Sequence, residues 1–207
     1  YLSELSEQEQ RRLFLSYKPD KSFDHFKSSL DDLDIGGLLG NPQMLKIFAD
    51  AYVRSNGKFS TKNQVFTDAI EQLATEKNDE NLQGDVRPTP SIILQGDETF
   101  CKVLLSGSAG IAITEGASDH EFPYVRSILC NGKSEEISAP LTGLFKPSDL
   151  PDQHEPIHRI IAEYSAARYL VRRIQNSSDR LTLNRILSII APNNVPRSEL
   201  RGVLAWM

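Results

Sequence analysis

Apolar residues recur every three or four positions along most of the chain, which is the spacing of amphipathic helices rather than of strands. In the first part of the sequence each apolar stripe follows a helix start signal. These signals are Ser6 with Glu9, Ser22, Asn41 with Pro42, and Thr61 with Gln64. We therefore predict four helices here, of which the third ends at Asn56 and Gly57 and the fourth ends at the polar stretch 77–87.

Two further helices are expected before residue 133. Pro88 and Pro90 predict a loop, Asp97 predicts the start of a helix that continues through Leu104, and Pro123 predicts a shorter helix that Gly132 closes. Together with the helix that begins after Thr61, these segments predict three successive helices between residues 62 and 131.

The pattern changes after these helices. The segments 141–145 and 154–157 flank a loop rich in proline and aspartate, which is typical of a two-stranded β hairpin. The helical period then returns over 158–175, in a segment that stops at Pro192, and in a last segment from Pro196. The predicted fold class is mainly α, with a helical subdomain followed by a winged-helix domain that carries a small two-stranded β wing.

Composition places the chain among ordinary globular proteins. It has 207 residues, 23 Lys and Arg against 28 Asp and Glu, and 39% hydrophobic residues, which suits one large domain or two small ones. The sequence contains neither an apolar run long enough for a membrane span nor a signal peptide, and its two cysteines show no CxxC spacing. We therefore expect a cytoplasmic protein without a membrane partner. Because the chain begins at Tyr1 and ends inside an apolar helical pattern, we also expect it to be part of a longer protein.

Charge is unevenly distributed. Residues 154–207 carry eight Arg and four acidic residues, whereas the preceding part carries the remaining 15 basic and 24 acidic residues. An arginine-rich face can bind anions or nucleic acid, but it can also be a solvated helix face with partners four residues apart, such as Glu155 and Arg159. The second interpretation is favoured.

Sequence motifs for catalysis are incomplete. The tripeptide GKS at 132–134 is not a phosphate loop, because Ser127 stands where the first glycine is needed and a helix is predicted before it. The segment SGSAG at 106–110 lacks the spacing of a nucleophile elbow. The four histidines, His25, His120, His154 and His158, show no metal-ligand spacing. We assign no catalytic residue and no metal ligand.

His158 differs from the other histidines because it lies between a predicted strand and a predicted helix. There an imidazole can donate a hydrogen bond to an anion, and the helix N-terminus adds a favourable field. A histidine that only packs or caps the helix is the competing interpretation, and spacing alone favours it.

Two segments, 39–76 and 154–170, resemble the regions that follow the nucleotide-binding core in NACHT-type STAND NTPases. The resemblance depends on two groups of residues, Gly40, Asn41, Pro42 and Leu45 in the first segment, and Ile157, His158, Glu163, Ala166, Ala167 and Leu170 in the second. It implies a helical subdomain at 1–58, a winged-helix domain at 59–176, and helices at 177–207 that lead to a C-terminal sensor region outside these residues.

The resemblance also implies a nucleotide site. Pro42 is expected to lie against the adenine and His158 to contact the β-phosphate, which would hold the ADP-bound state closed. ATP or ADP, with magnesium, would then be the cofactor of the full-length protein, whereas no cofactor is expected for these 207 residues alone. The sequence has no Walker A or Walker B motif, so this part of an ATPase is not expected to hydrolyse ATP by itself.

The functional hypothesis is therefore the regulatory lid of a nucleotide-gated STAND ATPase in signalling or defence. Its expected partners are a P-loop domain and a sensor region of the same protein, and further copies of the protein when it is activated. A winged-helix nucleic-acid binder is the first alternative, but Arg126 is the only basic residue of 123–131 and the net charge is −5. A helical protein-interaction module, with apolar ends that include Trp206, is the second.

Overall fold

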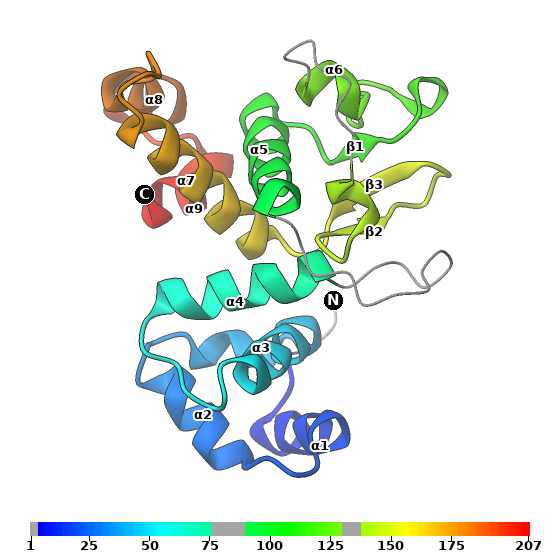
Figure 1. Cartoon of the computed structure of the whole chain (residues 1–207), viewed down its shortest axis with the longest axis vertical. Helices are drawn as coiled ribbons and strands as arrows, with labels where there is room; N and C mark the ends of the chain where they lie inside the picture. Colours follow the sequence, from blue (N-terminus) through cyan, green and yellow to red (C-terminus); the bar gives the residue numbers. More distant parts are fainter. Residues whose placement is uncertain (1–3, 76–89, 130–137) are drawn as a thin grey trace. The chain divides into compact units, whose positions relative to one another are not determined.

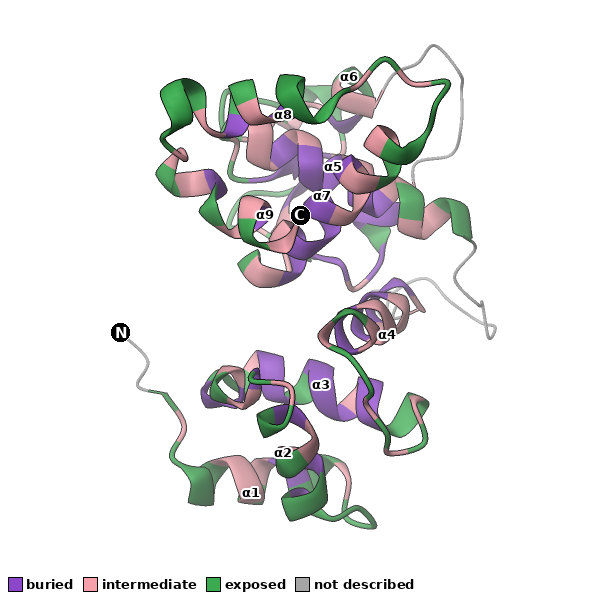
Figure 2. Ribbon diagram, turned by 90° about the vertical axis from the view of Figure 1, so that its left-hand side faces the viewer, coloured by how far each residue is buried: buried purple, intermediate pink, exposed green. Residues whose placement is uncertain are grey.

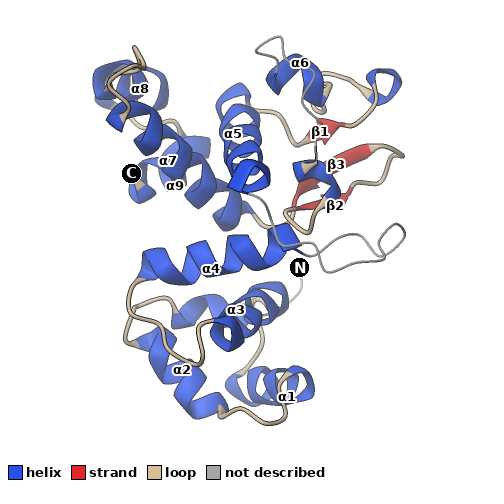
Figure 3. Ribbon diagram, in the orientation of Figure 1, coloured by secondary structure: helices blue, strands red, loops and turns tan. Residues whose placement is uncertain are grey.

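The computed structural model describes residues 4–75, 90–129 and 138–207. These residues form nine α-helices and a three-stranded antiparallel sheet (Figures 1 and 3), which confirms the prediction of a mainly helical fold with a small β element. The chain divides into two compact units, Tyr1–Leu73 and Ala74–Met207.

The first unit is built from helices alone. Its elements are α1 (Glu7–Tyr17), α2 (Phe23–Asp31), a 3-10 helix (Gly36–Gly40), α3 (Pro42–Arg54) and α4 (Lys62–Thr75), whose last two residues lie beyond the boundary of the unit. The predicted caps are present: Ser6 and Glu9 form a capping box, the Ser22 hydroxyl accepts from the His25 amide, and Asn41 caps α3.

Aromatic side chains fill the core of the first unit. Phe14 of α1 stacks on Phe26 of α2 with 4.6 Å between ring centroids, and Phe48 of α3 meets Phe66 of α4 edge-on at 5.5 Å. The second contact ties α4 to the helices that precede it. The compact unit therefore extends to Leu73, past the expected boundary at residue 58.

The second unit combines five helices with the sheet. Its elements are α5 (Pro90–Ser106), β1 (Ile111–Ala112), α6 (Val125–Leu129), β2 (Phe145–Pro147), β3 (Gln153–Pro156), α7 (Arg159–Gln175), α8 (Leu183–Ile190) and α9 (Arg201–Trp206). Helices α5 and α7 pack against each other, and many of their residues are buried (purple in Figure 2). One cluster of buried residues joins these two helices to α8 and α9: Cys101, Ala166, Ala167, Leu170, Ile186, Ile190, Leu200 and Val203.

Helix α5 begins earlier than predicted. It starts at Pro90, and Asp97 lies inside it with only 1% of its surface exposed. The prediction that Asp97 begins a helix is wrong because it treated an acidic residue as a solvent-exposed cap. The carboxylate is instead paired with Arg168 and Arg172 of α7, residues more than 70 positions away in the sequence.

The sheet differs from the predicted two-stranded wing. Its strands run in the order β1-β3-β2, so β3 is central, and β1 adds a third strand in which Ile111 lies opposite His154. The first strand of the predicted hairpin spans 145–147 rather than 141–145, because Ala139–Leu141 forms a 3-10 helix. A two-residue strand such as β1 shows no alternation of polar and apolar residues, so its sequence could not identify it.

Several predicted features lie outside the described residues. These are Cys130, the GKS tripeptide at 132–134, the polar stretch at 77–87 and Pro88. Among the residues that are described, no helix is both long and apolar enough to cross a membrane.

Candidate functional site

His158 is the N-cap residue of α7 and joins this helix to β3. Its backbone is extended, with φ −156° and ψ 139°, and its Nδ1 atom accepts a hydrogen bond from the Ile160 amide at 3.3 Å. The capping role that the sequence left open is therefore present. Because Nδ1 is the acceptor, the proton of the neutral imidazole lies on Nε2. That atom has no hydrogen-bond partner within the described parts of the chain.

The surroundings keep this imidazole neutral. His158 is half-buried, and burial lowers its pKa from the ordinary value, while the negative charge of Glu163 opposes that shift and the positive charge of Lys146 adds to it. A neutral ring at physiological pH offers Nε2–H as a donor. The N-terminus of the 17-residue α7 adds a partial positive charge at the same place.

Two basic residues lie near His158. Arg159 follows it directly in the sequence, and Lys146 lies on β2, the strand that pairs with β3. Lys146 of β2 pairs with Glu155 of β3 at 3.2 Å, in the register that places these two residues opposite each other. Arg159, the first residue of α7, pairs with Glu163 at 2.8 Å. The predicted Glu155–Arg159 pair is therefore wrong, since Glu155 belongs to a strand and not to the helix.

The sequence analysis did not identify Lys146 as part of this site. Only the register of β2 against β3 connects Lys146 with the segment that leads into His158, and residue spacing carries no signal of that register. The arrangement of an imidazole donor, a lysine and a helix N-terminus suits the binding of an anion.

Pro42 begins α3 in the first unit. The Asn41 side chain accepts hydrogen bonds from the amides of Gln43 and Met44 at 2.9 and 3.1 Å, so the helix start is held without the missing N–H of Pro42. The Pro42 ring is exposed and presents a rigid apolar surface. Pro42 and His158 belong to different compact units.

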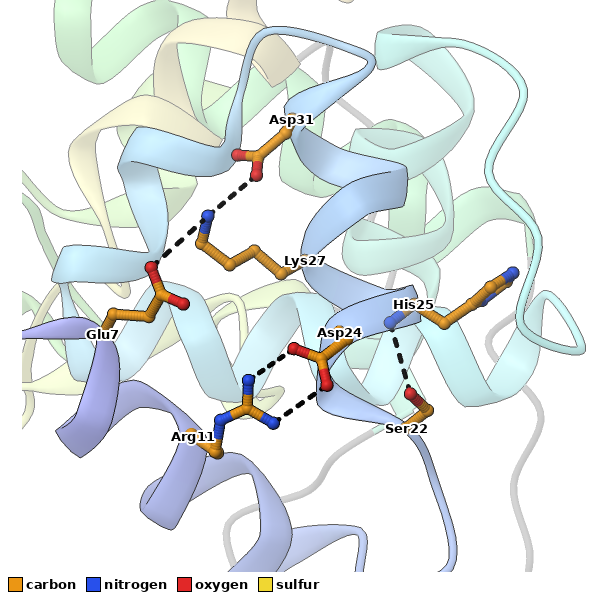
Figure 4. Close-up of polar contacts among 7 residues, drawn as sticks. All are labelled: Glu7, Arg11, Ser22, Asp24, His25, Lys27 and Asp31. Atoms are coloured by element: carbon orange, nitrogen blue, oxygen red, sulfur yellow. Dashed lines mark hydrogen bonds and ion pairs between the residues drawn. The ribbon is translucent and has the colours of Figure 1, made fainter.

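Helices α1 and α2 are joined by a cluster of charged side chains at the surface (Figure 4). Arg11 makes two hydrogen bonds to Asp24, and Lys27 lies 2.9 Å from Asp31 and 3.7 Å from Glu7. Donation by Arg11 lowers the pKa of Asp24. The three carboxylates are exposed, so these surface ion pairs contribute little to the packing of the two helices.

An apolar groove of about 420 Å³ lies at the other end of α7 from His158. Its lining residues are Val171, Ile174, Gln175, Leu183, Leu187, Leu204 and Met207. None of them is titratable, so we place the candidate site at His158, where charged and hydrogen-bonding groups converge. Within 4–75, 90–129 and 138–207, no group of three or more His, Cys, Asp or Glu residues could hold a metal ion.

Comparison of the chain with family models, curated proteins and solved structures finds no match.

Proposed function

We propose that this chain is the regulatory lid of a nucleotide-gated ATPase of the NACHT-type STAND class. In this proposal the lid distinguishes ADP from ATP and converts the difference into domain rearrangement and oligomerisation. The observation that carries the proposal is the state of His158: its Nδ1 caps α7, and its Nε2–H, which has no partner among the described residues, can donate to a phosphate oxygen.

The electrostatics of the site support the proposed phosphate contact. A neutral imidazole donor and the N-terminal dipole of α7 favour a negative group at the same place, and Lys146, which also pairs with Glu155, adds a nearby positive charge. The exposed Pro42 ring supplies an apolar surface of the kind that an adenine ring can lie against.

The remaining nucleotide-binding elements must come from another domain. The sequence has no Walker A motif to cradle the phosphates and no Walker B carboxylate for Mg²⁺. The lid would therefore bind and orient the nucleotide without hydrolysing it. A lid that binds the ADP state more tightly than the ATP state biases the equilibrium between a closed and an open protein by that difference in affinity.

In this proposal residues 59–176 are a winged-helix domain, with the β2–β3 hairpin as its wing. A winged helix that reads DNA needs a basic recognition helix, but α6 has five residues and Arg126 is its one basic side chain. This composition supports a regulatory role over nucleic-acid recognition.

The test measures ADP release from the full-length protein. His158→Ser keeps an N-cap acceptor for α7 but removes the imidazole donor, so it separates the proposed phosphate contact from helix capping. A hydrogen bond to a charged group contributes about 1.5–3 kcal/mol, so we expect ADP to dissociate roughly 10 to 100 times faster in stopped-flow experiments with fluorescent ADP. His120→Ser, at an exposed histidine of the same unit, is the matched control.

Unchanged ADP release in both His158→Ser and His158→Ala would overturn the phosphate contact. Pro42→Ala tests the base contact separately, because Asn41 still caps α3 in that variant. We expect it to weaken ADP binding without weakening the binding of pyrophosphate, which has no base.

A further inference from the structure

Helix α9 fits against α7 at a glycine. An ideal Cβ atom on Gly202 would lie 2.0 Å from Oε2 and 2.2 Å from Cδ of Glu163, so the Glu163 carboxylate occupies the space that any other residue would fill. The Glu163 side chain is only 13% exposed. Its carboxylate is therefore confined between the second turn of α7 and the backbone of α9.

Arg159 completes this contact. Its Nε atom donates to Glu163 at 2.8 Å, and one terminal nitrogen donates to the backbone carbonyl of Glu199 at 2.6 Å, immediately before α9. We name these four residues, Arg159, Glu163, Glu199 and Gly202, the α7–α9 clasp. The clasp is polar, and it lies at the end of α7 that begins at His158.

Apolar contacts hold the rest of α9. Trp206 meets Tyr164 edge-on, with 5.4 Å between ring centroids and an interplanar angle of 88°, and Leu200 and Val203 are buried. Trp206 is the only tryptophan of the chain. Its fluorescence therefore reports whether α9 is docked.

The clasp is connected to His158 both covalently and electrostatically. Arg159 follows His158 directly, and Glu163 is the acidic group whose charge acts on the imidazole. The other charged groups around the ring are Lys146 and, through its pairing with Lys146, Glu155. A change at α9 that moves Glu163 or frees Arg159 must therefore change the electrostatic environment of the imidazole.

We propose that the α7–α9 clasp couples the docking of helix α9 to the state of His158. Docked α9 confines the Glu163 carboxylate and occupies the Arg159 guanidinium, whereas undocked α9 lets the carboxylate move away from the imidazole and releases the guanidinium. Glu163 and Gly202 are thus positioning residues that act through His158. The functional consequence rests on the anion-binding role proposed for His158, but the coupling itself can be measured without nucleotide.

The test uses the full chain with Gly202→Ala and, as a matched control, Gly116→Ala, where an added Cβ meets nothing within 4 Å. Two readouts are recorded: the emission maximum of Trp206, and the pKa of His158 from NMR titration of its ring proton, assigned with His158→Ser. In Gly202→Ala we expect a red shift of Trp206 emission together with a lower His158 pKa, because the Glu163 charge that raises that pKa moves away. We expect neither change in Gly116→Ala.

A red shift of Trp206 with an unchanged His158 pKa would overturn the proposal, and so would a lower His158 pKa without any red shift, because the pKa would then change while α9 stays docked. If Gly202→Ala does not fold, Glu163→Gln is used instead. This variant keeps the shape of the side chain and removes its charge, so it must also lower the His158 pKa. An unchanged His158 pKa in Glu163→Gln would overturn the proposal as well. ADP release is measured in parallel. Normal ADP release in His158→Ser would refute the nucleotide role alone, since the titration of His158 does not depend on bound ADP.

Discussion

Asp97 of α5 and Arg168 of α7 form a bidentate ion pair inside the second unit, at 2.7 and 2.9 Å, although 71 residues separate them in the sequence. Asp97 is 1% exposed and the Arg168 side chain 13% exposed. Arg172, one turn further along α7 and 42% exposed, adds a bond of 2.9 Å to the same carboxylate. A carboxylate this deeply buried must be paired, so the ion pair fixes how α5 and α7 lie against each other.

Removing Arg168 should therefore strongly destabilise the second unit. Arg168→Ala leaves the Asp97 charge buried with only the partly exposed Arg172 as a partner. We expect the free energy of unfolding to fall by about 3 kcal/mol, measured by urea denaturation followed through Trp206 fluorescence. Arg172→Ala is the control, with an expected loss under about 1 kcal/mol because its pairing is screened by solvent. Equal losses of unfolding free energy in the two variants would show that the burial of Arg168 does not make its ion pair with Asp97 the stronger one.

Gly110 should not tolerate even one added methyl group. A Cβ there would lie 2.1 Å from the carbonyl oxygen of His154 and 2.8 Å from the Phe122 ring, and the carbonyl belongs to the central strand β3. We expect Gly110→Ala to destabilise the second unit by about 1–3 kcal/mol in the same urea assay. The surface position Gly116 provides the comparison, where Ala should be close to neutral.

Cys101 should be chemically inert in the folded protein. Burial raises the pKa of its thiol from 9.0 to about 12, which lowers the thiolate fraction near neutral pH about a thousandfold. In a Cys130→Ser background we expect a disulfide reagent such as DTNB to modify Cys101 only as fast as the protein opens. Urea should then accelerate the reaction sharply. Rapid labelling in the native protein would contradict the burial of this thiol.

Stability of the second unit should depend on pH through two histidines. Burial is the main cause that lowers the pKa of both His154 and His158 below 6.5, so the unfolded chain binds more protons than the folded one just below that pH. The free energy of unfolding should therefore decrease as pH falls from about 7.5 to about 5.5. The comparison is the double variant His154→Gln/His158→Ser, whose urea midpoint should vary less over this range. An identical pH profile in both proteins would exclude the histidines as the cause.

Helices of the first unit could be predicted from local sequence because their signals are local. The capping box of Ser6 and Glu9 and the Asn41–Pro42 start each lie within four residues of the helix that they begin. His158 was likewise identified at a helix start. Asp97 was wrongly predicted to begin a helix. From the sequence, an exposed aspartate that caps a helix looks the same as a buried aspartate inside one, because the partners of the buried carboxylate are distant in the chain.

The amino-acid sequence by itself determined the mainly helical class, the helix starts of the first unit and the presence of a histidine at the beginning of α7, since each depends on residues close together in the chain. The tertiary structure alone decided the third strand, the Asp97–Arg168 pair, the place of Lys146 near His158 and the fit of Gly202 against Glu163. Each of those contacts joins residues from distant segments. Their formation depends on burial and strand register, which the spacing of residues along the chain does not encode.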